Sequence, residues 1–211
     1  MVSDQYSVSF QSHNRKTILS STAIEDVKKQ HQSAANIGHA IFYFSFTDTH
    51  KQAYNDLLIS LVAQLCWKEP GLSMLRQAYE KTERKLPGPD ELKKILLASI
   101  VSYDVVYIHL DALDECPKSD GVRQKVICGI VELVEQTPNT QFLTTSRDVP
   151  DVRSIMEKSS ADPMPLVTQA VDADIQRYVA AELARDHKFS RLDPTVKEMI
   201  EATLMEKADG M

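Results

Sequence analysis

The chain has 211 residues, of which 43% are hydrophobic, so it can bury one sizeable core and at most a small appendage. Its 24 basic and 30 acidic residues give a net charge of −6 without a basic cluster, which argues against a nucleic-acid surface. The three cysteines lack C-x-x-C spacing and no apolar run approaches the roughly 20 residues of a membrane span, so we expect a cytoplasmic protein without membrane contact, disulfides or structural zinc.

The first predicted elements are a strand at residues 6–10 and a helix that includes residues 18–27. The helix is indicated by an apolar stripe at helical spacing, formed by Leu19, Ala23 and Val27. The pair Lys16-Thr17 precedes this stripe, so both residues are predicted to lie at a helix N-terminus, where phosphates bind. The pair matches the end of the phosphate-binding pattern G-x-x-x-x-G-K-[ST].

The two glycine positions of this pattern hold Phe10 and Arg15, and no glycine lies between them. Glycine reaches positive φ and lets backbone N–H groups approach the phosphates, so a side chain there costs about 1–3 kcal/mol. Each lost charge-assisted hydrogen bond removes roughly a further 1.5–3 kcal/mol. Since a K-T pair is also common by chance, this segment alone leaves both weak binding and no binding of phosphate open.

A strand at residues 40–46 follows, and then two helices with buried apolar stripes, at 53–65 and 92–100. The turn Pro87-Gly88-Pro89 marks an internal loop, because apolar helical patterns continue on both sides of it. Strands that alternate with helices are typical of β-α units and of a parallel sheet.

The most informative segment is the apolar run at 105–110, which ends in Asp111, Asp114 and Glu115. Since the run does not alternate, we predict a central strand that is buried on both faces and flanked by the strands at 40–46 and 141–145. Carboxylates at the C-terminal end of such a strand are typical of a Walker B segment, which holds Mg²⁺ and polarises water. The alternative is an apolar strand followed by a solvated acidic turn.

A helix at 122–134 leads to a strand at 141–145 that ends in Thr144-Thr145-Ser146-Arg147. Arginine binds phosphate bidentately through its planar fork, so Arg147 is a candidate sensor of a γ-phosphate. The alternative is an ordinary strand-ending turn with a solvated arginine. If the parallel sheet is correct, four side chains should cluster at one sheet edge: Asp111, Asp114, Glu115 and Arg147.

After a weak strand at 165–167 the chain becomes helical, with predicted helices at 172–185 and 194–207. Asp172 and Asp193 are the expected N-caps. The second helix carries an apolar stripe without a following segment to cover it, so we expect self-association; its residues are Val196, Met199, Ile200 and Leu204. The sequence ends in mid-pattern, as expected of a fragment or a truncated gene product.

Seven segments, in order, resemble the NACHT-type NTPase domain of fungal STAND proteins, which are NOD-like signalling receptors. They are residues 16–22 (KTILSST), 41–48 (IFYFSFTD), 57–66 (LLISLVAQLC), 110–117 (LDALDECP), 144–147 (TTSR), 171–175 (VDADI) and 206–211 (EKADGM). The resemblance implies an α/β P-loop NTPase fold, a three-layer αβα sandwich whose parallel sheet has the order 5-1-4-3-2. The start of a C-terminal helical subdomain would follow.

The same resemblance implies roles for the site residues. Lys16 and Thr17 would contact the β- and γ-phosphates, and Asp111 would hold Mg²⁺ through water, with Thr17 as a second metal ligand. The residues that would orient the attacking water or sense the γ-phosphate are Asp114, Glu115 and Arg147. The implied cofactor is ATP or GTP with Mg²⁺, bound weakly because the glycines are missing.

We therefore predict a divergent N-terminal segment with the first strand (1–15), a NACHT-like core (16–168) and the truncated beginning of a helical subdomain (169–211). The predicted function is a nucleotide-binding signalling switch with weak or absent hydrolysis, whose partners are nucleotide and a second copy or other signalling proteins. The alternative is a nucleotide-independent interaction module that retains the fold. The glycine-free loop favours this alternative, and the acidic segment with Arg147 favours the switch. A scaffold without a switch role is a third possibility, which the ordered motifs disfavour.

Overall fold

The computed structural model describes residues 6–10, 13–31, 36–156, 162–165, 168–185, 189 and 192–208. It divides into two compact units, Met1–Met164 and Pro165–Met211. Each unit is described by itself below.

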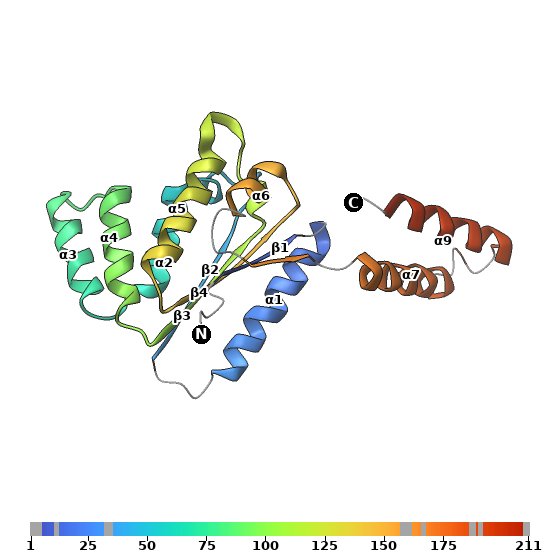
Figure 1. Ribbon diagram of the computed structural model, residues 1–211, viewed down its shortest axis with the longest axis horizontal. Helices are drawn as coiled ribbons and strands as arrows, with labels where there is room; N and C mark the ends of the chain where they lie inside the picture. Colours follow the sequence, from blue (N-terminus) through green and yellow to red (C-terminus); the bar gives the residue numbers. More distant parts are fainter. Residues whose placement is uncertain are drawn as a thin grey trace. The chain divides into compact units, whose positions relative to one another are not determined.

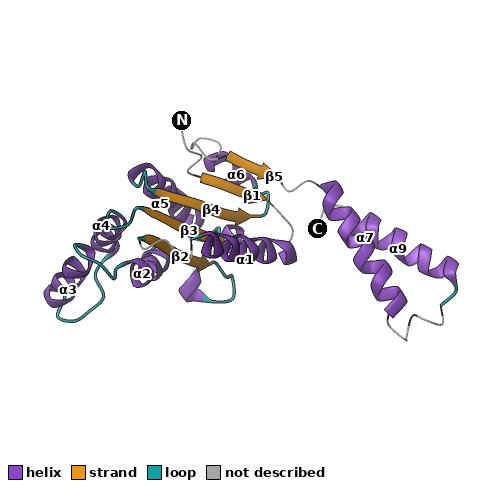
Figure 2. Cartoon of the chain, turned by 90° about the horizontal axis from the view of Figure 1, so that it is seen from below, coloured by secondary structure: helices purple, strands orange, loops and turns teal. Residues whose placement is uncertain are grey.

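One sheet organises the first unit (Figure 2). Its strands are β1 (Tyr6–Phe10), β2 (Ile37–Tyr43), β3 (Val105–Asp111), β4 (Thr140–Ser146) and β5 (Asp162–Pro165). The strand order is β2-β3-β4-β1-β5, which read from β5 is the order that the resemblance implies. The pairs β2–β3, β3–β4 and β4–β1 are parallel. The predicted strand at 165–167 shares only Pro165 with β5, and residues 166 and 167 lie outside the described residues.

The strand predicted at 40–46 lies three residues earlier, because the chain leaves the ladder at the end of β2. Phe44 N–H still bonds the carbonyl of Asp111 at 3.0 Å, but Ser45 N–H turns to the carbonyl of Lys51 at 3.1 Å. The last residues of the apolar run, up to Phe46, therefore belong to a loop. This loop lies at the C-terminal end of the sheet, beside the acidic segment.

Six helices of the first unit are described: α1 (His13–Gln30), α2 (Tyr54–Leu65), α3 (Gly71–Lys81), α4 (Pro89–Ile100), α5 (Val122–Gln136) and α6 (Pro150–Met156). The helices α2, α4 and α5 gather on one side of the sheet and α1 lies on the other (Figure 1). Three layers result, as the resemblance implies. The helices α3 and α6 were not predicted.

The two faces of β3 differ in what covers them. Val106, Ile108 and Leu110 join the main core together with α2, α4 and α5. On the opposite face Tyr107 is only half-buried, and its hydroxyl hydrogen-bonds to His31 Nε2 at 3.0 Å, directly after α1. The prediction of a strand fully buried on both faces is thus wrong for its first half. The end of α1 covers this half incompletely and leaves it half-buried.

The buried face of α1 is also displaced from the predicted stripe. Ser20 and Ile24 are buried, whereas Ala23 and Val27 are half-buried, and the side chain of Leu19 lies outside the described residues. The polar Ser20 in the buried face explains why the apolar spacing pointed to neighbouring positions.

The second unit contains two helices that contact each other, α7 (Thr168–Arg185) and α9 (Pro194–Ala208). The predicted cap at Asp193 is confirmed, since its Oδ1 accepts a hydrogen bond from Thr195 N–H at 2.9 Å. The predicted cap at Asp172 is wrong, because α7 begins four residues earlier and no proline or glycine interrupts it. Within the described part of the chain, every helix is too short or too polar to cross a bilayer.

The apolar stripe of α9 provides a test of self-association. Met199 and Leu204 are 62% and 45% exposed, so their replacement by glutamate adds charge at the surface without unfolding the helix. We expect M199E/L204E to shift the chain toward monomer in light scattering, with an unchanged circular dichroism spectrum. The variant T195E/A202E adds the same charge on exposed positions of α9 and should leave the association unchanged. A wild-type chain that is monomeric at high concentration would contradict the expectation.

Candidate active site

The carboxylate of Asp111 ends the central strand β3 and is 2% exposed. The hydroxyl of Thr145, on the neighbouring strand β4, donates a hydrogen bond to Asp111 Oδ1 at 2.5 Å. The same hydroxyl accepts a hydrogen bond from Ala112 N–H at 3.0 Å. Thr145, on strand β4, therefore fixes the orientation of the Asp111 carboxylate, a role that no motif in the sequence indicates.

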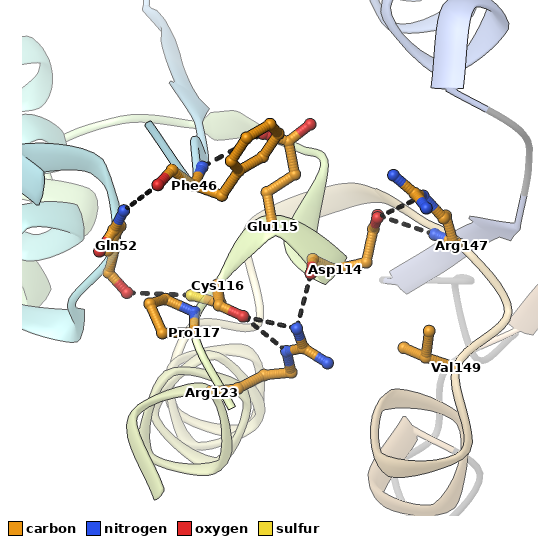
Figure 3. Close-up of a pocket in the computed structure, with 9 residues that line it drawn as sticks. All are labelled: Phe46, Gln52, Asp114, Glu115, Cys116, Pro117, Arg123, Arg147 and Val149. Carbon is orange, nitrogen blue, oxygen red and sulfur yellow. Dashed lines mark hydrogen bonds and ion pairs between the residues drawn. The ribbon is translucent and has the colours of Figure 1, made fainter. Parts of the chain in front are cut away.

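Asp114 and Arg147 are joined to each other (Figure 3). The backbone N–H of Arg147 donates to Asp114 Oδ1 at 2.8 Å, and its Nε lies 3.0 Å from Asp114 Oδ2. The Asp114 side chain is 4% exposed, whereas that of Arg147 is 50% exposed. The arginine thus covers the carboxylate while its own side chain borders solvent.

Glu115 connects the acidic segment to the loop after β2. Its Oε2 accepts a hydrogen bond from Phe46 N–H at 3.3 Å. The Gln52 amide donates to the carbonyls of Ser45 and Phe46 at 3.0 and 2.8 Å and so holds that loop in place. The predicted clustering of the three acids and Arg147 at the C-terminal edge of the sheet is confirmed.

A cavity of about 450 Å³ opens between these segments (Figure 3). Its lining combines carboxylates, arginines and a few apolar side chains: Phe46, Gln52, Asp114, Glu115, Cys116, Pro117, Arg123, Arg147 and Val149. The mixture of charges suits a polar, charged ligand.

The chain turns sharply after Asp111, because Ala112 adopts a left-handed conformation with φ 59° and ψ 47°. For a residue with a side chain this conformation costs about 1–3 kcal/mol. The turn leads into the 3₁₀ helix Leu113–Glu115, in which Leu113 is buried. The strained residue therefore places Asp114 and Glu115 over the strand end.

Cys116 anchors the end of this turn, since its thiol donates a hydrogen bond to the carbonyl of Gln52 at 3.0 Å. Burial raises the pKa of this thiol to about 12, although the nearby Arg123 acts in the opposite direction. The thiol is therefore protonated at neutral pH and serves packing and hydrogen bonding, not nucleophilic chemistry.

Thiol labelling tests this assignment. At pH 8 we expect the native chain to react at Cys128, which is exposed, and not at the buried Cys66 and Cys116. Titration with a chromogenic disulfide should release one equivalent from the native chain and three after denaturation. The variant C128S should abolish the native reaction; rapid labelling of that variant would show that a buried thiol is accessible.

The phosphate-binding segment differs from its prediction. Helix α1 begins at His13, so Lys16 is its fourth residue and Thr17 its fifth. Phe10 ends β1, paired with Ser146, and Arg15 is already helical. Phe10 and Arg15, at the two glycine positions, therefore lie in a strand and a helix, since neither adopts the positive φ of a phosphate loop without strain.

The start of α1 nevertheless offers backbone donors to a ligand. The first four N–H groups of a helix lack intrahelical partners, and in α1 these include those of His13, Asn14 and Arg15, directly before Lys16. The side chains of Lys16 and Thr17 lie outside the described residues.

The parallel sheet has this strand order and is covered by helices on both faces. Its central strand ends in a buried aspartate, and two further acids follow. These features define a P-loop NTPase-type domain. The chain belongs to the nephrocystin 3 N-terminal family, whose model matches residues 15–147, more than half of the chain. This match runs from the residue before Lys16 to Arg147 and so spans both ends of the predicted site. A fungal origin does not follow from it.

Solved structures with a similar fold include the Orc1 protein of Aeropyrum pernix in complex with DNA. That likeness has a TM-score of 0.55 at 13% identity and covers 87% of this chain and 50% of that one. A Walker-type ATPase of Pyrococcus abyssi has a TM-score of 0.49 at 8% identity, covering 96% of this chain and 58% of that one. The chain thus spans about half the length of these proteins. Among curated proteins no match was found.

Proposed function

We propose that this domain is a signalling switch that binds ATP or GTP with Mg²⁺ and hydrolyses it weakly or not at all. The observation that carries the proposal is the buried carboxylate of Asp111, held by Thr145 at the end of the central strand. Carboxylate and hydroxyl oxygens are the ligands that Mg²⁺ prefers, so Asp111 and Thr17 suit it. Lys16, in the first turn of α1, suits the phosphates.

When bound, Mg²⁺ would neutralise phosphate charge. Asp111 and Thr17 would hold the metal, and Asp114 and Glu115 would orient the water. Arg147 Nε is paired with Asp114, so contact with a γ-phosphate would bring a second anion to the same guanidinium. The repulsion between the two anions, together with the missing glycines, supports slow turnover.

Affinity provides the direct test. If two hydrogen bonds of the phosphate loop are lost, binding should be weaker than in an intact P-loop by roughly 10²-fold or more. Titration with a fluorescent ATP or GTP analogue, with and without Mg²⁺, should show weak binding that Mg²⁺ strengthens. The variant D111N should remove the effect of Mg²⁺, because asparagine can still accept the Thr145 hydrogen bond but carries no charge.

The matched control is D120N, which makes the same charge change at an exposed position. This control should leave the titration unchanged. Micromolar or tighter binding of Mg-ATP by the wild-type chain would contradict the argument from the missing glycines.

The alternative function is a nucleotide-independent interaction module, with a second copy or other signalling proteins as its partners. One observation favours it: β1 ends at Phe10 and α1 begins at His13, so a six-residue glycine loop is not present. Absence of nucleotide binding at millimolar concentration, with or without Mg²⁺, would select this alternative.

A further inference from the structure

Arg123, in the first turn of α5, is buried beneath residues 111–116, the acidic turn (Figure 3). Only 8% of its surface is exposed. Its Nε and Nη2 donate to the carbonyl of Cys116 at 2.8 and 2.6 Å. Nη2 also donates to the carbonyl of Asp114 at 2.7 Å. One planar guanidinium thus binds two carbonyl groups of the same turn.

The two carbonyls lie on either side of Glu115. Because both are held by one rigid group, the backbone that carries the Glu115 side chain is fixed at both ends. The Asp114 side chain is fixed separately by Arg147 N–H, and the Cys116 side chain by the carbonyl of Gln52. The acidic turn is therefore fastened to α5, to the segment after β4 and to the loop after β2.

A buried guanidinium needs an anion, since an unpaired buried charge is costly. Asp151, in the short helix α6, supplies it through an Nη1–Oδ2 contact of 3.0 Å. Asp151 lies four residues after Arg147, so Arg123 links the acidic turn after β3 to the segment after β4. A lysine could not make these contacts, because its ammonium is a single point and not a planar fork.

We infer that Arg123 is a positioning residue for the nucleotide reaction. It holds the backbone on both sides of Glu115 in place and so determines where the Glu115 and Asp114 carboxylates hold water. This inference deepens the proposed function and rests on it. Arg123 need not touch nucleotide, because its whole effect passes through the acidic turn.

The test compares R123K with the matched control R153K in the whole chain. Arg153 is exposed on α6 and pairs with Asp148. Three measurements are made: amide hydrogen exchange, a nucleotide assay under Mg²⁺ that gives both affinity and turnover, and denaturant unfolding, which gives the midpoint. The informative amides are those of Glu115 and Cys116, which bond the carbonyls of Ala112 and Leu113 at 2.8 and 3.2 Å.

For R123K we expect these two amides to exchange about tenfold faster while other segments keep their rates. Turnover should fall by on the order of tenfold, since small misplacements of orienting groups cost at least that much. The nucleotide dissociation constant should stay within about twofold, because Lys16, Thr17 and Asp111 are untouched. R153K should behave as wild type in all three measurements.

Several results would overturn the inference. Unchanged exchange, exchange that rises evenly over the chain with a lower midpoint, or a loosened turn with normal turnover would each do so. A wild-type chain that binds nucleotide but does not hydrolyse it would refute the role of Arg123 in the reaction. A chain that binds no nucleotide refutes the proposed function instead, and the exchange measurement then still decides whether Arg123 fixes the turn. If R123K does not fold, D151N, which keeps the arginine and removes its anion, carries the same test.

Discussion

Replacing His109 by leucine should stabilise the protein, and should do so most strongly in mild acid. His109 lies on β3 between Ile108 and Leu110 and is 4% exposed. Neither ring nitrogen has a hydrogen-bond partner among the described residues. Burial lowers the pKa of His109 to about 4, and the nearby His39 on β2 and Lys28 on α1 act in the same direction.

The sign of the pH effect follows from the two pKa values of His109. In the unfolded chain the imidazole takes up a proton near its ordinary pKa of 6.5, whereas in the folded chain it does so only near 4. Between these values the unfolded state binds more protons, so stability falls as the pH drops from about 6.5 to about 4 and levels off below. The full difference corresponds to about 3 kcal/mol.

Guanidinium unfolding of wild type and H109L at pH 7 and pH 4.5 measures this effect. At pH 7 the gain should be about 1–2 kcal/mol, because leucine removes a buried unpaired polar group. At pH 4.5 the gain should be larger by roughly 2–3 kcal/mol. The control H50L replaces an exposed histidine, and its effect on stability should be small. An equal gain for H109L at both pH values would show that His109 takes up its proton in the folded state as easily as in the unfolded one.

The sequence predicts the sheet well because its signals are local. The apolar run at 105–110, the alternation of strands and helices, and the acids that follow the central strand are all visible within short windows. Helix α3 was missed although Met74 and Leu75 pack against the core, because only Gly71 and Ala78 are fully buried in it and no long stripe of buried large side chains marks it. Helix α6 was missed because its 7 residues are too few to show a period.

The site could be predicted only as far as its chemistry is carried by side chains in motifs. Asp111, Asp114 and Glu115 lie in one short segment, and Arg147 follows from the expected sheet. Arg123 could not be predicted in this way, because arginine at the start of a helix is normally solvated and its partners here are backbone carbonyls. Such acceptors occur at every residue and leave no mark in the sequence.

Ala112 illustrates the same limit for the backbone and leads to the second large effect. Alanine is not a residue that indicates positive φ, yet Ala112 is left-handed and 7% exposed. Valine should be far worse at this position, since a β-branched side chain disfavours the left-handed region and adds volume in a packed site. We expect A112V to lower the free energy of unfolding by about 3 kcal/mol.

Glycine provides the matched control for this position. It adopts the left-handed region without strain but loses more chain entropy on folding, so A112G should stay within about 1 kcal/mol of wild type. Denaturant unfolding measures both variants, and nucleotide titration under Mg²⁺ shows whether the turn still presents its acids. If strain at Ala112 serves to place Asp114 and Glu115, A112G should keep its stability and still lose part of the turnover, because a freer backbone holds the turn less firmly. Equal stability of A112V and A112G would mean that the backbone at this residue is not left-handed in solution.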